Sequence, residues 1–351
     1  MQRGLSLQEM ANVVSNQARD KKDYLSPSSL MHMDLDADRT PRLRLGGDKY
    51  FQLGRTAETQ VREYTKIPSV YWKRCLEEAP PLLSLNVNHW LLQKEGETRM
   101  VRTLGDRARA VLSPGYRALD NNELVGSIIP ILAEEGIEIH ASNVSEDYFH
   151  LQGFVPTLRQ DVRVGDTVEL GISVRNSEVG KGRLTITRWL KRLICLNGMK
   201  GQEILGKTHL GKQMDQVNVA QEYLRDSTRE LNDQAFFETV KDAVRGNLTE
   251  LALTEECDVL RKAAGETITI RAGLAVEVVR QHCNLSERQG QDVLDTLIRH
   301  GDMSRWGYAN AVTAQAHDES LTFDQNMDFQ VAGRMVMELP QSKWAKLAEA
   351  V

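Results

Sequence analysis

The stretch that decides the fold runs from Gly165 to Lys212 and reads GDTVELGISVRNSEVGKGRLTITRWLKRLICLNGMKGQEILGKTHLGK. Apolar and polar residues alternate in TVELGISVRN and again in GRLTITRWLK, which is the pattern of strands that bury one face. Glycines separate these segments, as turns between strands require. We therefore expect a β-sheet to run through this stretch.

The residues before this stretch extend the same pattern. TRMVRTL and RARAVLS flank Gly105-Asp106, a typical hairpin turn. A helix is expected from about Asn121 to a C-terminal cap at Gly136, followed by the alternating segments IEIHASNVS and YFHLQGFV. A hairpin, a helix and an antiparallel meander, without regular crossover helices, indicate the α+β class.

The pattern divides the chain into three regions. Residues 1–97 are expected to be a mainly helical N-terminal region, in which Ser26–Leu45 is polar, contains prolines and is predicted to be a loop or an irregular extended segment. Residues 98–212 form the α+β core, an antiparallel β-meander with flanking helices. Residues 213–351 have helical periodicity almost throughout and are predicted to form a mostly helical C-terminal region.

Composition sets outer limits on the function. The chain has 351 residues, of which 41% are hydrophobic and 26% are charged, as in ordinary globular proteins. No apolar run approaches the roughly 20 residues of a membrane span, and the first residues lack the apolar core of a secretory leader. The four cysteines are scattered, which excludes a CxxC metal or redox site. We expect a cytoplasmic protein with no membrane partner.

The charge distribution is more informative than the net charge of −5. Between Arg175 and Lys212 there are nine basic residues and two acidic ones, whereas from Gln213 onward 23 acidic residues face 14 basic ones. A basic segment in an acidic protein indicates a local site for a polyanion.

The basic strand is the candidate binding site. Thr185, Thr187 and Trp189 alternate with Ile186, Arg188 and Leu190, so a strand here would present a positive strip that includes an aromatic ring. Such a strip suits the backbone and bases of single-stranded DNA. The predicted nucleic-acid-binding residues are Arg175, Lys181, Arg183, Arg188, Trp189, Lys191 and Arg192. The alternative is a sheet face whose charges pair with the acidic C-terminal helices.

One literal motif needs weighing. GQEILGKT, from Gly201 to Thr208, matches the phosphate-binding P-loop pattern. However, Ile204 and Leu205 are bulky for such a loop, and no downstream strand ends in an Asp that could hold magnesium. We interpret the match as accidental, and a P-loop NTPase is the less favoured alternative.

The sequence supplies no set of catalytic residues. It contains no nucleophile motif, and no histidine pair has metal-ligand spacing on a helix. We therefore expect a protein that is not an enzyme and that has no cofactor and no bound metal.

Several segments together resemble a known family. They are IPSVYWKRCLEEAPPLLSLNVNHWL, VRTLGDRARAVLSPGYRALDNNELV, GDTVELGISVRNSEVGKGRL and RLICLNGM, with WGYANAVT as a weaker match. These segments resemble a phage/plasmid-like protein family, domain of unknown function 932. The resemblance covers about Ile67 to Lys212 and implies a mobile-element setting. The family has no established reaction, so the resemblance supplies no catalytic residues.

The expected function joins the resemblance to the fold. A helix followed by an antiparallel meander is similar to the phage single-strand annealing proteins of the Rad52-like kind, which are recombination proteins that assemble as rings. This analogy implies a non-catalytic protein that binds single-stranded DNA as a homo-oligomer, although a fold alone does not determine function. The alternative is a protein-binding regulator or an anti-defence factor.

Overall fold

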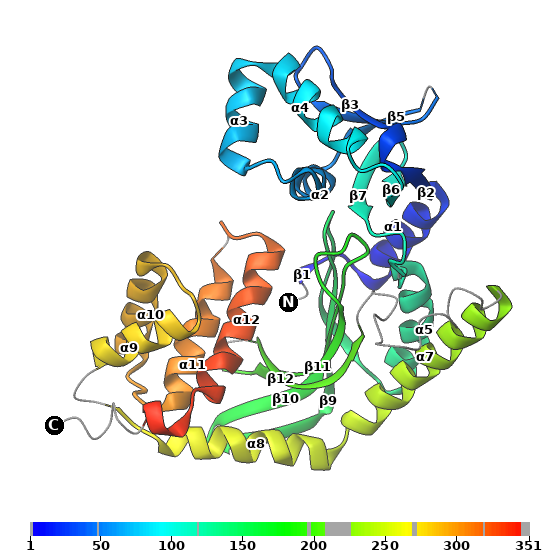
Figure 1. Cartoon of the computed structure of the whole chain (residues 1–351). Coiled ribbons are helices and arrows are strands. Elements are labelled where there is room, and N and C mark those ends of the chain that lie inside the picture. The colour runs from blue at the N-terminus through cyan, green and yellow to red at the C-terminus, as the bar shows by residue number, and fades with distance from the viewer. Residues whose placement is uncertain are drawn as a thin grey trace.

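The computed structural model describes residues 3–47, 49–117, 119–194, 198–207, 226–268, 272–318 and 320–344. Within these ranges, two six-stranded sheets and their helices form an α+β fold, which confirms the predicted class. Figure 1 shows the two sheets one above the other.

The first sheet, which we call sheet A, contains the predicted meander. Five consecutive strands pair antiparallel, and the short β1 adds to the edge parallel to β8. In spatial order the strands are β1 (Arg3–Gly4), β8 (Glu138–Val144), β9 (Phe149–Arg163), β10 (Asp166–Asn176), β11 (Leu184–Arg192) and β12 (Gly198–Lys207). The meander is therefore one strand longer than the four that the sequence predicts.

The second sheet, sheet B, joins the predicted hairpin to strands from the first 97 residues. Its spatial order is β2 (Lys21–Pro27), β6 (Thr98–Leu104), β7 (Arg107–Leu112), β5 (Tyr50–Leu53), β4 (Pro41–Leu45) and β3 (Met31–Leu35). Most of Ser26–Leu45 is therefore in strands β2, β3 and β4, with the short 3₁₀ turn η1 (Ser28–Leu30). The predicted loop is wrong, and the extended alternative is a set of regular paired strands. Met31, Met33 and Leu43 explain the difference, because they alternate with polar residues and are buried.

The helices cover these sheets in groups (Figure 1). With sheet B lie α2 (Arg55–Thr65), α3 (Ser69–Glu78) and α4 (Pro80–Leu92). Around one face of sheet A lie α1 (Leu7–Asp20), α5 (Asn121–Glu134), α7 (Asp226–Asn247) and α8 (Glu250–Gly265). The remaining helices are α9 (Ala272–His282), α10 (Glu287–His300), α11 (Arg305–Ala314), the 3₁₀ turn η2 (Gln315–His317) and α12 (Phe323–Glu338). The predicted helical C-terminal region is confirmed for its described residues.

Sheet A has one apolar face and one polar face. Leu170, Ile172 and Val174 of β10 are fully buried in the main core. The residues between them face the other side, where Ser173 lies opposite Thr187 and Arg175 lies opposite Thr185. Helix α12 packs over this polar face at β12. A sheet face lined by polar groups under a helix is where we look for a site.

The segment Asn176–Gly180 joins the two sheets. The Glu178 carboxylate accepts hydrogen bonds from Lys21 and Arg109, each at 3.0 Å, and from the backbone N–H of Asn121 at 2.7 Å. The carbonyl of Val179 accepts a bond of 2.8 Å from Gln60 of α2. All five residues of the segment except Gly180 are buried. The NSEVG motif is therefore a structural junction.

Candidate nucleic-acid interface

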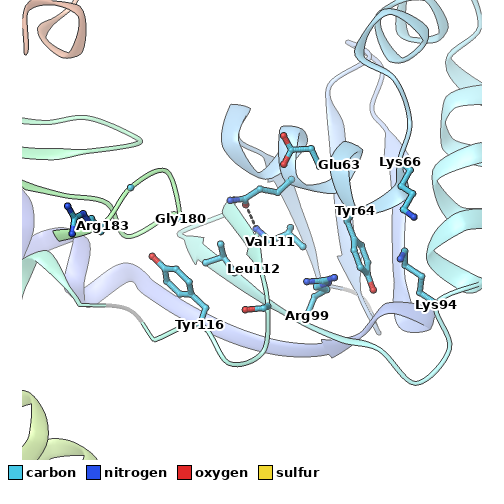
Figure 2. A pocket seen from close by; sticks show the side chains of 13 residues that line it. Glu63, Tyr64, Lys66, Lys94, Arg99, Val111, Leu112, Tyr116, Gly180 and Arg183 are labelled. Atoms are coloured by element: carbon cyan, nitrogen blue, oxygen red, sulfur yellow. Dashed lines mark hydrogen bonds between the residues drawn. The ribbon is translucent and has the colours of Figure 1, made fainter. Parts of the chain in front are cut away.

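Two adjoining cavities open beside this junction. The first, cavity 1, has a volume of about 670 Å³ and lies between α2, β7 and the turn that follows β10 (Figure 2). Its lining includes Gln60, Glu63, Tyr64, Lys66, Lys94, Arg99, Tyr116 and Arg183. It is therefore built from residues far apart in the chain: α2 supplies Gln60, Glu63 and Tyr64, sheet B supplies Arg99, Val111 and Leu112, and loops and turns supply the rest.

The second cavity, cavity 2, lies on the polar face of sheet A under α12 and has a volume of about 400 Å³. Its lining includes Tyr148, Arg175, Lys181, Arg183, Thr185, Thr187, Lys200, Glu203, Arg334 and Glu338. Gly182 and Arg183 line both cavities, so the two cavities adjoin at these residues as one lined surface. We call it the basic groove.

The groove is positively charged. Eight basic side chains line it, against three acidic ones: Glu63, Glu203 and Glu338. Two of the acids pair within the groove, because Glu203 lies 2.8 Å from Arg183 and Glu338 lies 2.8 Å from Arg334. Lys94 and Arg99 each lie 3.6 Å from Glu97, so among the described residues the positive charge without an ion pair is on Lys66, Arg175, Lys181 and Lys200. A polyanion is the ligand that this charge favours.

Tyr64 organises the cations of cavity 1. Its ring lies between Arg99 and Lys94 in Figure 2, with the guanidinium 3.7 Å and the ammonium 4.3 Å from the ring centroid. The Tyr64 hydroxyl donates a bond of 2.8 Å to Glu97, and this bond holds the pKa of the Glu97 carboxyl below its ordinary value. Because two cations occupy the ring, Tyr64 positions charge and does not offer a free face for a base.

Arg175 and Tyr148 form a similar pair in cavity 2. The Arg175 guanidinium lies 3.8 Å from the centroid of the Tyr148 ring. The Tyr148 hydroxyl donates a bond of 3.0 Å to the carbonyl of Lys181, which fixes the turn that carries the exposed Lys181 side chain. Burial raises the pKa of Tyr148 above its ordinary value, so this hydroxyl keeps its proton.

Lys200 is the most unusual cation of the groove. It lies opposite Trp189 in the β11–β12 pairing and is 8% exposed. Burial, reinforced by the charge of Arg175, lowers the pKa of its ammonium to about 8, although Asp328 and Glu203 act in the other direction. In the described part of the chain its ammonium has no ion pair or hydrogen bond. An ammonium held in this way is available to an anion that enters cavity 2.

Three of the seven predicted binding residues line this groove. Arg175, Lys181 and Arg183 come together at cavity 2, and Arg183 also reaches cavity 1. Arg183 and Lys181 are exposed, so they are open to a ligand. The structure thus brings together the part of the predicted set that lies at the turn between β10 and β11.

Arg188 and Trp189 are placed elsewhere, which corrects the predicted set. Arg188 lies 3.0 Å from Glu255 and 3.6 Å from Glu256 of α8 and is 8% exposed. The Trp189 ring is fully buried, and its N–H donates a bond of 2.9 Å to Gln330 of α12. A Cβ at Gly198 would meet the indole at 2.5 Å, so the ring is also tightly covered. Trp189 cannot be an exposed stacking platform.

Lys191 and Arg192 are likewise structural. The Lys191 ammonium lies 3.1 Å from Glu169 and 3.4 Å from the centroid of the Phe154 ring. Arg192 makes two bonds to Asp166, which also accepts a bond of 3.0 Å from the Trp306 indole. For Arg188 the alternative expected from the sequence, pairing with the acidic C-terminal helices, is what the structure shows. For Lys191 and Arg192 the partners are in β10 instead.

The P-loop match is a strand. Gly201–Lys207 belongs to β12 and pairs antiparallel with β11, with Lys207 opposite Leu184. The Lys207 ammonium lies 3.6 Å from the centroid of the Phe236 ring. A strand has no row of amides that could cradle a phosphate chain. The described part of the motif therefore excludes the P-loop geometry, and Thr208 lies outside the described residues.

Five basic residues of the groove were not in the predicted set: Lys66, Lys94, Arg99, Lys200 and Arg334. Lys200 lies within the basic segment, so its charge was a usable signal. The other four come from other regions, and no local pattern marks them. Arg334, for example, faces the groove because α12 covers β12, where it bonds to Glu256 at 2.9 Å.

Other site types have little basis in the described residues. Across these ranges, no three or more His, Cys, Asp or Glu side chains are grouped so that they could hold a metal ion. His150 is buried and lies 2.8 Å from Asp324, and burial lowers the pKa of its imidazole. None of the helices that the structure describes combines the length and the apolar character needed to cross a bilayer.

Comparison with protein-family models, with curated proteins and with solved structures found no match to this chain. The geometry of the groove is therefore the basis on which a function is assigned.

Proposed function

We propose that this chain is a non-catalytic protein that binds single-stranded DNA along the basic groove. The single observation that carries the proposal is the meeting of cavities 1 and 2 at Arg183. Two adjoining cavities with eight basic side chains suit an extended polyanionic backbone, whereas an isolated pocket would suit a small ligand. In the mobile-element setting implied by the family resemblance, the corresponding activity is annealing of complementary strands in the cytoplasm.

The structure also shapes how such binding would work. The aromatic rings of the groove already have partners: Tyr64 contacts Arg99 and Lys94, and Tyr148 contacts Arg175. The third ring, Tyr116, is largely buried, and its hydroxyl donates to the carbonyl of Ser177. We therefore expect the phosphates to be held in the groove and the bases to point outward, where a second strand can pair with them. This arrangement predicts little sequence preference and a strong dependence on salt.

Fluorescence anisotropy with labelled single-stranded DNA tests the proposal. The affinity should fall with rising salt concentration, and duplex DNA of the same sequence should bind more weakly. A matched pair of variants separates the groove from the rest of the surface: Arg183→Ala in the groove, and Lys262→Ala on the exposed side of α8. No binding of single strands at low salt, or equal losses in both variants, would refute the proposal.

A second candidate function, association with a protein, is favoured by one observation. The two helices α3 and α4 expose several large apolar side chains: Val70 (78%), Tyr71 (40%), Leu82 (43%), Leu85 (67%), Trp90 (47%) and Leu92 (60%). Tyr71 and Trp90 also line a cavity of about 320 Å³. Exposed apolar groups concentrated in this way mark contact surfaces.

We propose that this surface joins copies of the chain in a homo-oligomer, as the annealing analogy implies. Light scattering after size exclusion measures the mass directly. Leu85→Glu should reduce the mass of the assembly, whereas Val259→Glu, at an exposed apolar residue of α8, should not. If the native chain is monomeric at all concentrations, the homo-oligomer is refuted. The surface would then bind a different protein, as the regulator or anti-defence alternative requires.

A further inference from the structure

Cavity 2 contains cations without carboxylate partners. Lys200 of β12, Arg175 of β10 and Lys181 of the turn after β10 all line it, and none of them forms an ion pair with another described residue. The basic residues with partners, Arg183 and Arg334, are paired with Glu203 and Glu338. Three separate positions therefore direct unpaired positive charge into one space.

Two of these cations, Lys200 and Arg175, have buried polar groups. Lys200 is only 8% exposed. The Nε atom of Arg175 is buried without a hydrogen-bond partner. An unpaired buried charge or donor is costly to the fold. An anion that enters the cavity and bonds to Lys200 and Arg175 would offset part of this unfavourable free energy.

The remaining lining identifies the kind of anion. The two threonines at the floor of the cavity, Thr185 and Thr187, add hydroxyls beside the cations. A doubly charged oxyanion matches three cations better than a singly charged one, because each extra charge adds an attraction at close range. A phosphate monoester carries nearly two charges at neutral pH, whereas the phosphodiesters along a strand carry one each.

We propose that cavity 2 is a binding site for a phosphate monoester dianion, held by Lys200, Arg175 and Lys181. One source of such a dianion is the terminal phosphate of a DNA strand lying in the groove. For this source the inference rests on the proposed function. Inorganic phosphate has the same chemistry and is the second source.

Two measurements on the full chain test the inference. The first is isothermal titration with inorganic phosphate at pH 7. The second compares the affinities of two single strands of one sequence, one with a 5′-phosphate and one with a 5′-hydroxyl. We expect phosphate to bind and the phosphorylated strand to bind at least about threefold more tightly.

The variants locate the site. Lys200→Met keeps the length of the side chain and removes its charge, and it should weaken phosphate binding about tenfold or more. Lys181→Met, at an exposed position where folding is not at risk, should weaken it by a smaller factor. Lys262→Met, at an exposed lysine of α8 outside the groove, is the matched control and should leave phosphate affinity unchanged.

The outcomes separate this inference from the proposed function. Phosphate binding that Lys200→Met and Lys181→Met weaken, with no binding of strands, supports the phosphate site, assigns it to the free ion and overturns the proposed function. Equal affinity for both strands, with no titration by phosphate, overturns the inference and leaves the proposed function intact. Phosphate binding that neither groove variant weakens also overturns the inference, because the ion would then lie elsewhere.

Discussion

Arg109 of sheet B and Glu178 of the segment after β10 form a buried ion pair, with 3.0 Å between the guanidinium Nη1 and the carboxylate Oε2. Their side chains are 6% and 3% exposed. Glu178 also accepts from Lys21 and from the backbone N–H of Asn121, so one carboxylate holds three donors from three elements. The groove depends on this junction, because cavity 1 lies beside it.

Removal of the Glu178 charge should therefore destabilise the fold. Glu178→Gln leaves the buried Arg109 without its carboxylate partner, while Lys21 keeps Asp120 at 2.7 Å, and the loss of a buried partner costs about 3–5 kcal/mol. Chemical denaturation should show this decrease in the free energy of unfolding. The control is Glu203→Gln, which removes the exposed partner of Arg183 and should cost under about 1 kcal/mol. Equal effects of the two variants would contradict the role of the junction.

The same junction predicts a loss of stability in acid. The charges of Lys21 and Arg109 outweigh burial and hold the pKa of the Glu178 carboxyl below its ordinary value of 4.5. A lowered folded-state pKa means that the unfolded chain binds the proton more readily. The contribution to stability is therefore complete above pH 4.5 and is lost as the pH falls toward the folded-state pKa. In acid titrations of unfolding, Glu178→Gln should show a shallower pH dependence than the native chain.

Lys200 predicts a second rise of stability with pH, at alkaline pH, although here the charged form is the one that destabilises the fold. Its pKa is lowered from 10.5 to about 8, so between these values the unfolded chain binds a proton that the folded chain has released. Stability should rise with pH across this window, and below pH 8 the buried ammonium costs a few kcal/mol. Lys200→Met should remove this cost and raise the free energy of unfolding at pH 7 by about 1–3 kcal/mol. A variant that is less stable than the native chain at pH 7 would contradict this assignment.

Trp189 should matter to stability and not to DNA binding. Trp189→Phe removes the indole N–H that bonds to Gln330 and leaves a small void in the core. We expect a loss of about 1–3 kcal/mol in the free energy of unfolding. The affinity for single-stranded DNA should stay within twofold of the native value, as measured by anisotropy. A large loss of affinity in a folded variant would return Trp189 to the binding surface.

The basic residues along the groove should contribute additively to the salt dependence of DNA binding. Lys66→Ala in cavity 1 and Arg183→Ala between the cavities each remove one cation, and each should reduce the slope of log affinity against log salt by about 0.7. The double variant should reduce the slope by about twice that amount if one strand contacts both cavities. A double variant that equals Arg183→Ala would show that the strand does not reach cavity 1.

Much of the fold follows from local patterns. The meander, the β6–β7 hairpin around Gly105, the helix that begins at Asn121 and the helical C-terminal region are all visible in periodicity and in turn residues. Ser26–Leu45 was missed because its strands are short and two of them contain prolines. β3, β4 and β5 pair with one another within residues 31–53, whereas β2 pairs with the distant residues 98–104. Strand pairing at that separation leaves no local trace.

The site was harder to predict because one strand has two faces. Alternation correctly places Thr187 and Trp189 on the face opposite Arg188, but it does not say which helix covers each face. Helix α12 buries Trp189, and α8 neutralises Arg188 with Glu255. The residues at the turn, Lys181 and Arg183, are exposed at the mouth of the cavities that they line. Local charge predicts a site only where tertiary packing leaves that charge uncovered.

The first two strands, β1 and β2, each pair with a strand much later in the chain, and this affects how the protein folds during synthesis. Arg3 of β1 lies beside Ala141 of β8, and Lys21 of β2 lies beside Leu104 of β6. During synthesis the first strands leave the ribosome long before their partners, so neither sheet can close until residues 98–144 have emerged. Contacts between such distant segments slow folding. The N-terminal strands β1 and β2 are therefore expected to pair late in folding. A fragment that ends before residue 98 would lack β6 and β7, the two strands that lie between β2 and β5 in sheet B.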